Sequence, residues 1–265
     1  MNYTDINAET IDRWVESGWE WGKPISHDEY LLALRGRWQM VLTPNKPVPK
    51  AWFPDLTDKR VLGLAAGGGQ QMPIFAALGA KCTVLDYSVR QLESERLVSD
   101  REGYPIHIVR ADMTKPFPFE DEAFDLIFHP VSNCYIQDVH HVWKECYRVL
   151  ESGGLLMAGL DNGINFLFDE EDESRITGTL PFDPLTNMEQ MESLRKRDDG
   201  VQFSHTIEEQ IAGQIRAGFE LVDVYEDTNS VGFLKDHGVP TFWATLARKK
   251  QQSIYSTFRR FTKTA

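Results

Sequence analysis

The sequence has 265 residues, enough for one large domain with a sizeable core, or for one domain with an added lid. It holds 28 Lys and Arg against 40 Asp and Glu, a formal net charge of −12 that disfavours a nucleic-acid backbone as partner. Its three cysteines are odd in number and lack metal-ligand spacing, and no apolar run could span a membrane. We therefore expect a cytoplasmic protein without disulfides, metal, nucleic-acid partner or membrane partner.

Residues 1–58 precede the predicted core and are expected to form a helical lid and connector. Apolar side chains recur at helical spacing in Ile6–Trp21 and in His27–Met40, which predicts two helices. A proline-rich, extended connector follows them. Five of the seven tryptophans lie in this region, where packing is their commoner role and lining a pocket the alternative. Trp38 is kept as a candidate substrate contact.

The core begins with Val61–Ala65, an apolar run that predicts a buried strand. Three glycines at 67–69 form a turn in which the backbone can approach a ligand. A helix over Gln71–Leu78 and a second strand over Cys82–Leu85 follow, and the strand ends in Asp86. This order describes half of a nucleotide-binding α/β domain. The turn is expected to present unpaired N–H groups to the ligand, and the acid to accept ribose hydroxyls.

Alternating helices and strands continue after Asp86, and Ser88 is placed to cap the first of these helices. The pattern predicts a doubly wound α/β fold. The expected elements are a helix at 88–102, strands at 106–109 and 124–128, a helix at 139–150, a glycine stop at 151–154 and a strand at 155–160.

The remaining chain predicts an insertion and a closing unit. Residues 161–203 form the insertion, whose acidic run Asp169–Glu173 is interpreted as solvated surface more readily than as a cation site. A helix at 206–217, strands at 219–225 and 241–247, and a basic tail at 249–265 complete the chain. The central domain is therefore expected to span residues 59–248.

The glycine turn lacks the third glycine of a dinucleotide fingerprint. It resembles motif I of the class I S-adenosylmethionine-dependent methyltransferases, with Ala65, Gly67 and Gly69 at the three small positions. Asp86 matches the acid that closes the second strand in that family. Gly63 departs from the motif, which usually has an acid at this place.

Three further segments resemble the same family in the same order. Ala111-Asp112-Met113 resembles the segment that holds adenine, PFPFEDEAFDLIFHP the segment around the fourth strand, and YRVLESGG the helix-to-strand turn before the fifth. The resemblance covers residues 58–160. It implies a Rossmann-like sheet of seven strands, mostly parallel, with an antiparallel last strand beside the sixth.

The resemblance implies an enzyme that transfers a methyl group from S-adenosylmethionine to a small molecule by in-line displacement. Such a reaction requires alignment of the acceptor more than any one catalytic residue. His129, directly after the fourth strand, is expected at the mouth of the site, as a general base or, with slight preference, a cofactor contact. The implied cofactor-binding residues are Ala65, Gly67, Gly69, Asp86, Tyr87, Asp112, Met113 and His129.

The loop after the fourth strand supplies the other substrate candidates, Ser132, Asn133 and Tyr135, for which loop hydrogen bonding is an equal alternative. Two other functions stay open: an NAD(P)-dependent oxidoreductase, and a non-catalytic S-adenosylmethionine-binding protein. The identity of the acceptor, the atom that is methylated, and the assembly, a homodimer included, also stay open.

Overall fold

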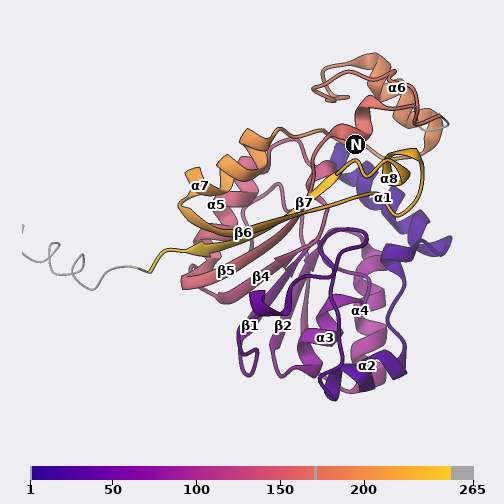
Figure 1. Ribbon diagram of the computed structural model, residues 1–265. Helices are drawn as coiled ribbons and strands as arrows, with labels where there is room; N and C mark the ends of the chain where they lie inside the picture. The colour runs from indigo at the N-terminus through magenta and orange to yellow at the C-terminus, as the bar shows by residue number, and fades with distance from the viewer. Residues whose placement is uncertain (1, 170–171, 252–265) are drawn as a thin grey trace, which may run out of the picture.

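The computed structural model describes residues 2–169 and 172–251. A seven-stranded sheet with the strand order β3-β2-β1-β4-β5-β7-β6 runs through the molecule (Figure 1). The strands are β1 Arg60–Leu64, β2 Lys81–Asp86, β3 Ile106–Arg110, β4 Phe124–His129, β5 Leu150–Asp161, β6 Phe219–Asp227 and β7 Phe242–Lys249. The first five are parallel, and β7 is antiparallel to both of its neighbours. The predicted fold class is confirmed.

Helices cover both faces of the sheet. Helices α2, α3 and α4 contribute to one core cluster, and α5 to the cluster on the other face, against which Ala217 of α7 also packs. The helices are α1 Tyr3–Glu16, α2 His27–Leu34, α3 Gln71–Ala77, α4 Val89–Glu102, α5 Val139–Val149, α6 Met188–Arg197, α7 Gly213–Ala217 and α8 Phe233–Asp236. Within the described ranges, no helix has the length and apolarity needed to cross a membrane.

The two N-terminal helices are shorter than the apolar spacing suggested. Helix α1 ends at Glu16, and Gly18 then takes a φ of 91°, so the chain turns before Trp21. Helix α2 ends at Leu34, just before Gly36 with a φ of 75°. Glycine takes these left-handed conformations without the strain that other residues meet, so each glycine permits the turn that ends its helix.

The fifth strand starts earlier than predicted, because residues 151–154, expected to form the stop between the helix and the strand, are already part of the strand. Strand β5 starts at Leu150, which pairs with Phe124, whereas the next pair joins Leu155 to Leu126. The segment between Leu150 and Leu155 on β5 is therefore longer than the segment between Phe124 and Leu126 on β4, with which it pairs. The extra residues leave the ladder as a bulge, which Gly153 permits with a φ of 86°.

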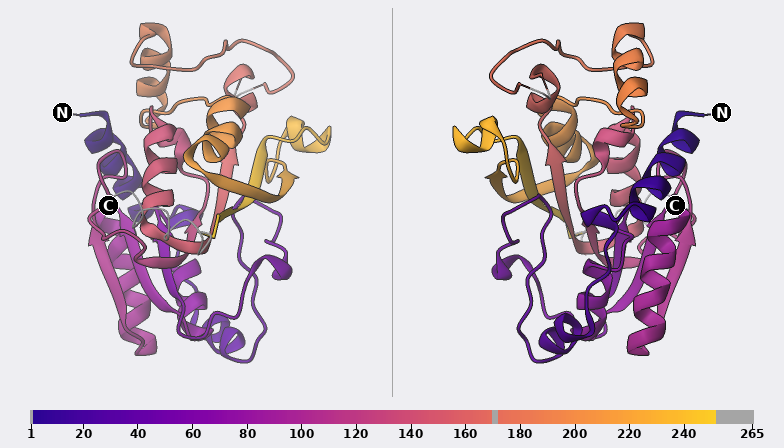
Figure 2. Two further views of the ribbon diagram at one scale, coloured as in Figure 1. Left: turned by 90° about the vertical axis from the view of Figure 1, so that its left-hand side faces the viewer. Right: turned by 90° about the vertical axis from the view of Figure 1, so that its right-hand side faces the viewer.

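The insertion contains a helix that the sequence did not indicate, and the helix expected after the insertion begins differently from its prediction. Helix α6 occupies part of the polar stretch at 188–200 and lies beyond the end of the sheet, as both views of Figure 2 show. The helix expected at 206–217 begins as a π-helical turn over Glu208–Ala212 and continues as α7. Oγ1 of Thr206 caps it by accepting the N–H of Glu209 at 3.1 Å. Part of the acidic run, residues 170–171, and most of the basic tail lie outside the described residues.

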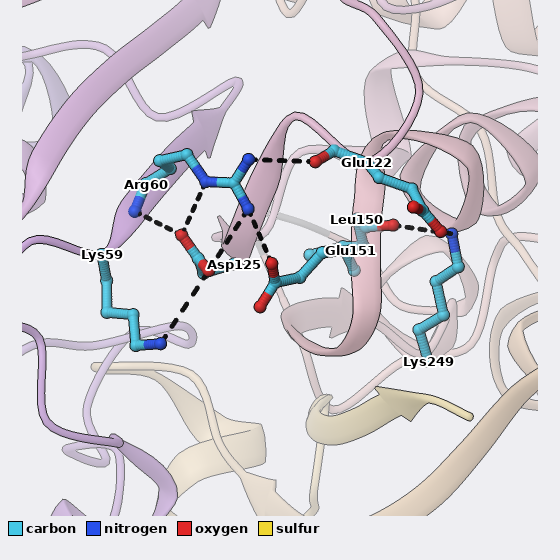
Figure 3. A network of polar contacts seen from close by, with 7 residues as sticks. All are labelled: Lys59, Arg60, Glu122, Asp125, Leu150, Glu151 and Lys249. Atoms are coloured by element: carbon cyan, nitrogen blue, oxygen red, sulfur yellow. Dashed lines mark hydrogen bonds and ion pairs between the residues drawn. The ribbon is translucent and has the colours of Figure 1, made fainter. Parts of the chain in front are cut away.

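Ion pairs and hydrogen bonds join four strands at the end of the sheet where the parallel strands begin (Figure 3). Arg60 on β1 donates to Asp125 on β4 at 2.9 Å and to Glu151 on β5 at 2.7 Å. Lys249 on β7 donates to the carbonyl of Leu150 at 2.6 Å. Burial opposes the charge on Asp125, but hydrogen bonds from the Arg60 side chain and backbone lower its pKa to about 2. Contacts within the protein thus occupy this end of the sheet. A ligand-binding site is expected at the opposite end, where the parallel strands finish.

Candidate active site

A cavity of about 320 Å³ lies at the carboxyl ends of the parallel strands. Helix α1 crosses this end of the sheet (Figure 1). Ala8 and Ile11 of α1 line the cavity, as do Trp19 and Trp21 after it, and this segment forms the roof of the cavity. Two of the five N-terminal tryptophans thus face the pocket. Open α/β sheets place their ligands at this edge, because the loops after successive strands meet there.

One wall of the cavity is the segment 41–44, which packs tightly on the sheet. The N–H of Val131, after β4, donates to the carbonyl of Leu42 at 3.1 Å. A Cβ on Gly159 of β5 would lie 2.0 Å from the same carbonyl oxygen. Only glycine allows this approach, so the wall is held against β4 and β5.

The glycine turn at 67–69 is bonded to the protein rather than open to a ligand. Gly67 donates its N–H to Oδ2 of Asp86 at 3.1 Å. The next two N–H groups donate to the carbonyl of Gln91 at 2.9 Å and to Oε1 of Glu95 at 2.7 Å. The expectation that these three N–H groups are unpaired is therefore wrong. Helix α4 supplies the last two acceptors and holds the turn in place.

Asp86 ends β2 and lines the cavity, as do Ala65 and Gly67 of the glycine motif, whereas Gly69 does not. Oδ1 of Asp86 accepts the N–H of Ser88 at 3.0 Å. Burial raises the pKa of Asp86 to about 6, against the opposing effect of these backbone N–H groups. Each carboxylate oxygen has two lone pairs, so both retain capacity for a further donor.

Tyr87, Asp112 and Met113 continue the lining toward the edge strand β3. The Tyr87 hydroxyl donates to Oδ1 of Asp5 on α1 at 2.8 Å, which ties this wall to the roof. Oδ1 of Asp112 accepts the N–H of Thr114 at 2.8 Å, and no described residue donates a hydrogen bond to Oδ2. Apart from Gly69, the structure thus brings together the residues predicted at the ends of β1, β2 and β3.

His129 does not reach the mouth of the site. Its side chain is fully buried (0% exposed) and does not line the cavity. Nδ1 lies 2.8 Å from the carbonyl oxygen of Leu64, and Nε2 lies 2.8 Å from Oδ1 of Asn133. Burial lowers the pKa of the ring, although both of these contacts oppose that shift. The strand continues one residue further than predicted, so His129 belongs to β4 and joins its end to the end of β1.

Some of the predicted substrate residues line the cavity and others do not. Ser132 and Tyr135 line the cavity, whereas Asn133 is fully buried and donates to Oε1 of Gln210 at 3.1 Å. Trp38 is not placed for the predicted contact with substrate either. It packs edge-on against Phe53, with ring centroids 5.0 Å apart, and does not line the cavity.

The acid missing at position 63 has a structural explanation. A Cβ on Gly63 would lie 2.7 Å from Sδ of Met72, which is fully buried on α3. The thioether of Met72 thus fills the space that a longer side chain would need. No carboxylate can enter the site from this position.

Several lining residues carried no local signal in the sequence. Asn7 on α1 is buried, donates to the carbonyls of Tyr135 at 3.0 Å and Val201 at 2.9 Å, and accepts the N–H of Val201 at 2.6 Å. It therefore holds the roof to the loop after β4 and to the end of the insertion. Asp161 ends β5 and lines the cavity beside Phe242. The one sequence signal for Asp161 is its position directly after the predicted strand at 155–160, where open α/β sheets place ligands.

Comparison with known proteins agrees with this geometry. A family model described as a methyltransferase domain matches residues 62–158. The uncharacterized methyltransferase YbaJ of Bacillus subtilis (strain 168) is 40% identical over 249 residues, which cover 92% of this chain and 97% of YbaJ. The chain belongs to the class I S-adenosylmethionine-dependent methyltransferases. It is therefore a methyltransferase whose methyl donor is S-adenosylmethionine, and not a nicotinamide-dependent oxidoreductase.

Other similarities to this methyltransferase are narrower. An S-adenosylmethionine dependent methyltransferase from Mesorhizobium loti has the same fold, with a TM-score of 0.59 and 20% identity over 75% of this chain and 94% of that one. The sarcosine/dimethylglycine N-methyltransferase of Halorhodospira halochloris is 33% identical over 100 residues, covering 37% of this chain and 36% of its own. A match over so little of either chain does not identify the acceptor.

The cavity fits the charge of S-adenosylmethionine, which carries a sulfonium and an ammonium group against one carboxylate. Asp86, Asp112 and Asp161 line it, and no Lys, Arg or His is found among its lining residues in the described ranges. Buried polar atoms of lining residues, Oγ1 of Thr4 and Oε1 of Gln91 among them, also have no hydrogen-bond partner within the described part of the chain. Buried polar atoms of this kind are satisfied when a polar ligand binds.

Proposed function

We propose that this methyltransferase acts on a small-molecule acceptor by in-line transfer of the methyl group. The supporting observation is the cavity itself, which lies under α1 and is bounded by the segment 41–44. A covered cavity of this size suits small ligands. Its acidic lining and the net charge of −12 both disfavour a nucleic acid.

In this proposal the cofactor lies along the ends of β3, β2 and β1. Asp86 accepts the ribose hydroxyls, because both of its oxygens retain a lone pair. Asp112 binds the adenine amino group, and Met113 packs on the ring. Ala65 and Gly67 leave room for the methionine portion. His129 is not part of this set, since its ring has no face on the cavity.

The acceptor then occupies the part of the cavity above β4 and β5, beside Ser132 and Tyr135. The methyl group to be transferred carries an activated leaving group, so the enzyme chiefly excludes water and aligns the acceptor. We assign the covering role jointly to residues 1–58 and to the insertion at 161–203, which Asn7 connects. The three cysteines are buried and unpaired, which fits the reducing cytoplasm expected for this enzyme.

Titration calorimetry tests the cofactor site directly. S-adenosylmethionine and its demethylated product should bind, and NAD should not. Asp86→Ala should reduce their affinity at least about tenfold, because two charge-assisted hydrogen bonds are lost. Asp100→Ala removes an exposed carboxylate from α4 and should leave the affinity unchanged. Equal affinities for the two variants would contradict the assignment of Asp86.

Transfer of a labelled methyl group tests the acceptor class. Label should appear in the low-molecular-weight fraction of an extract incubated with the enzyme and labelled cofactor. Label recovered only in protein or RNA would show that the acceptor is not a small molecule.

A further inference from the structure

The three carboxylates of the cavity lie at the ends of three different strands. Asp86 ends β2, Asp112 follows β3, and Asp161 ends β5. The first two belong to the strands that we assign to the cofactor. Asp161 is separated from β1 by two strand spacings, about 10 Å, because β4 lies between β1 and β5. One negative charge thus lies in the part of the cavity assigned to the acceptor.

The carboxylate of Asp161 is only partly used by the protein. Oδ1 accepts the N–H of Gly163 at 2.6 Å, a local turn that an asparagine oxygen would serve equally well. Within the described part of the chain, Oδ2 has one long contact, from the amide of Asn165 at 3.4 Å. No Lys, Arg or His in the described ranges pairs with Asp161. A carboxylate without a cation next to it, on the wall of a cavity, is suited to a cationic or proton-donating ligand.

The surroundings of Asp161 restrict the kind of ligand further. Leu42 and Val131 supply apolar surface, and Phe242 pairs with Asp161 across β5 and β7. Burial raises the pKa values of Cys134 and Tyr135, and the charge of Asp161 adds to both shifts, so both groups stay neutral. An anionic acceptor would meet no positive charge here.

We propose, building on the function proposed above, that the acceptor is a primary or secondary amine with an apolar body and that Asp161 binds its nitrogen. Asp161 holds the protonated amine by a charge-assisted hydrogen bond and takes its proton. The amine nitrogen then donates its lone pair to the methyl carbon, a C–N bond forms, and the C–S bond breaks with its electron pair passing to sulfur. The methylated ammonium product leaves, and Asp161 passes its proton to solvent.

The protonation behaviour of Asp161 agrees with this role. Burial raises the pKa of Asp161 to about 6, although the N–H of Gly163 and the amide of Asn165 oppose the shift. The side chain is therefore ionised near neutral pH, yet is more basic than an exposed aspartate. A base with a pKa close to the working pH can both accept and release a proton.

A second role for Asp161 would be to hold the ammonium group of the cofactor itself, in place of the acid missing at Gly63. The sheet disfavours this, because Gly63 is level with Phe128 on β4 and Met157 on β5. Asp161 lies four residues beyond Met157, about 13 Å further along the strand. The two roles differ in whether loss of the carboxylate weakens cofactor binding.

Three probes of one shape and different charge test the proposal without knowledge of the natural acceptor. Benzylamine, benzyl alcohol and benzoate are titrated into the wild-type protein saturated with S-adenosylhomocysteine. Benzylamine should bind at least about tenfold more tightly than the alcohol, and benzoate more weakly than either. An amine affinity no higher than that of the alcohol, absence of binding included, would overturn the proposal.

Asp161→Asn keeps the oxygen that accepts the Gly163 N–H and removes the charge. It should abolish the preference for benzylamine while leaving the affinity for S-adenosylhomocysteine within about twofold of wild type. Glu226→Gln, a matched change at an exposed carboxylate on β6, should retain the preference. Circular dichroism verifies that both variants fold, and the probe series on wild-type protein does not depend on them.

The two proposals fail in different ways. If S-adenosylhomocysteine does not bind wild-type protein, the proposed cofactor site is wrong. If it binds and Asp161→Asn weakens it at least tenfold, Asp161 is a cofactor residue and the amine proposal is wrong. If cofactor binding is intact but transfer occurs to phenols or carboxylic acids and not to amines, only the acceptor class is wrong.

Discussion

Gly67 donates its backbone N–H to the carboxylate of Asp86 across 3.1 Å, although 19 residues separate the two in the chain. This bond joins the turn after β1 to the end of β2. A cofactor that contacts both elements therefore meets a preformed surface. The alignment of the turn and the carboxylate depends on the absence of a side chain at Gly67.

Gly67→Ala should disrupt this alignment. An added Cβ would lie 2.6 Å from Cβ of Gln91 and 2.9 Å from Oδ2 of Asp86, closer than van der Waals contact allows. We expect the affinity for S-adenosylhomocysteine to fall at least about tenfold by calorimetry. Gly103→Ala is the control, because a Cβ there meets no atom within 4 Å, although its φ of 75° costs about 1 kcal/mol of stability. Equal cofactor affinity in the two variants would contradict the prediction.

His129→Ala should act on stability rather than on chemistry. The ring is fully buried between Leu64 and Asn133, so its removal leaves a void and an unpaired carbonyl. We expect the free energy of unfolding to fall by about 2–4 kcal/mol in chemical denaturation. His107→Ala, on the exposed side of β3, should change it by less than about 0.5 kcal/mol. A variant of unchanged stability whose kcat falls about 10²-fold or more would instead restore His129 as a general base.

Glu95→Gln should change how stability depends on pH. Burial raises the pKa of Glu95 to about 8 in the folded protein, against the opposing hydrogen bond from Gly69. The unfolded chain loses this proton near pH 4.5, so the folded state holds the extra proton between these values. Wild-type stability therefore falls as pH rises through this window, by at most about 1.4 kcal/mol per pH unit. The glutamine variant lacks this loss and should be the more stable protein at pH 8.

Denaturation of both proteins at a series of pH values measures the difference. It should be small near pH 4.5 and grow toward pH 8. Glu93→Gln, an exposed position on the same helix, should give no such trend. A constant difference between wild type and Glu95→Gln would mean that Glu95 is ionised in the folded protein.

Asn7→Ala should loosen the roof of the cavity. The side chain makes three hydrogen bonds, two to Val201 and one to the carbonyl of Tyr135. Without them, backbone hydrogen exchange should speed up in α1 and near residue 201, while the strands keep their protection. Glu9→Ala, exposed on the same helix, should leave exchange unchanged. If exchange is unaltered in Asn7→Ala, the other contacts of α1, such as the hydrogen bond from Tyr87 to Asp5, are sufficient to hold the roof.

Features with a local chemical cause were predictable from the sequence. The Ser88 cap, accepting the N–H of Gln91 at 3.1 Å, and the acid ending β2 follow from a few adjacent residues. The position of His129 was not predictable, because one extra residue of β4 turned its ring into the core. Asn7 and Asp161 depend on partners far along the chain, which no local pattern specifies. The N-terminal tryptophans show the same limit, since their spacing predicts a helix but not which of them face the cavity.

The bonds of Asn7 also have a consequence for biosynthesis. Helix α1 is synthesised before the domain that it covers, and its partner Val201 follows Asn7 by 194 residues. The roof therefore cannot close on a nascent chain until most of the protein has been made, and closing so long a loop is entropically costly. A ligand that binds only the covered cavity stabilises the finished protein and none of its earlier intermediates. Truncated chains that end before Val201 should consequently gain no protection from proteolysis by the cofactor.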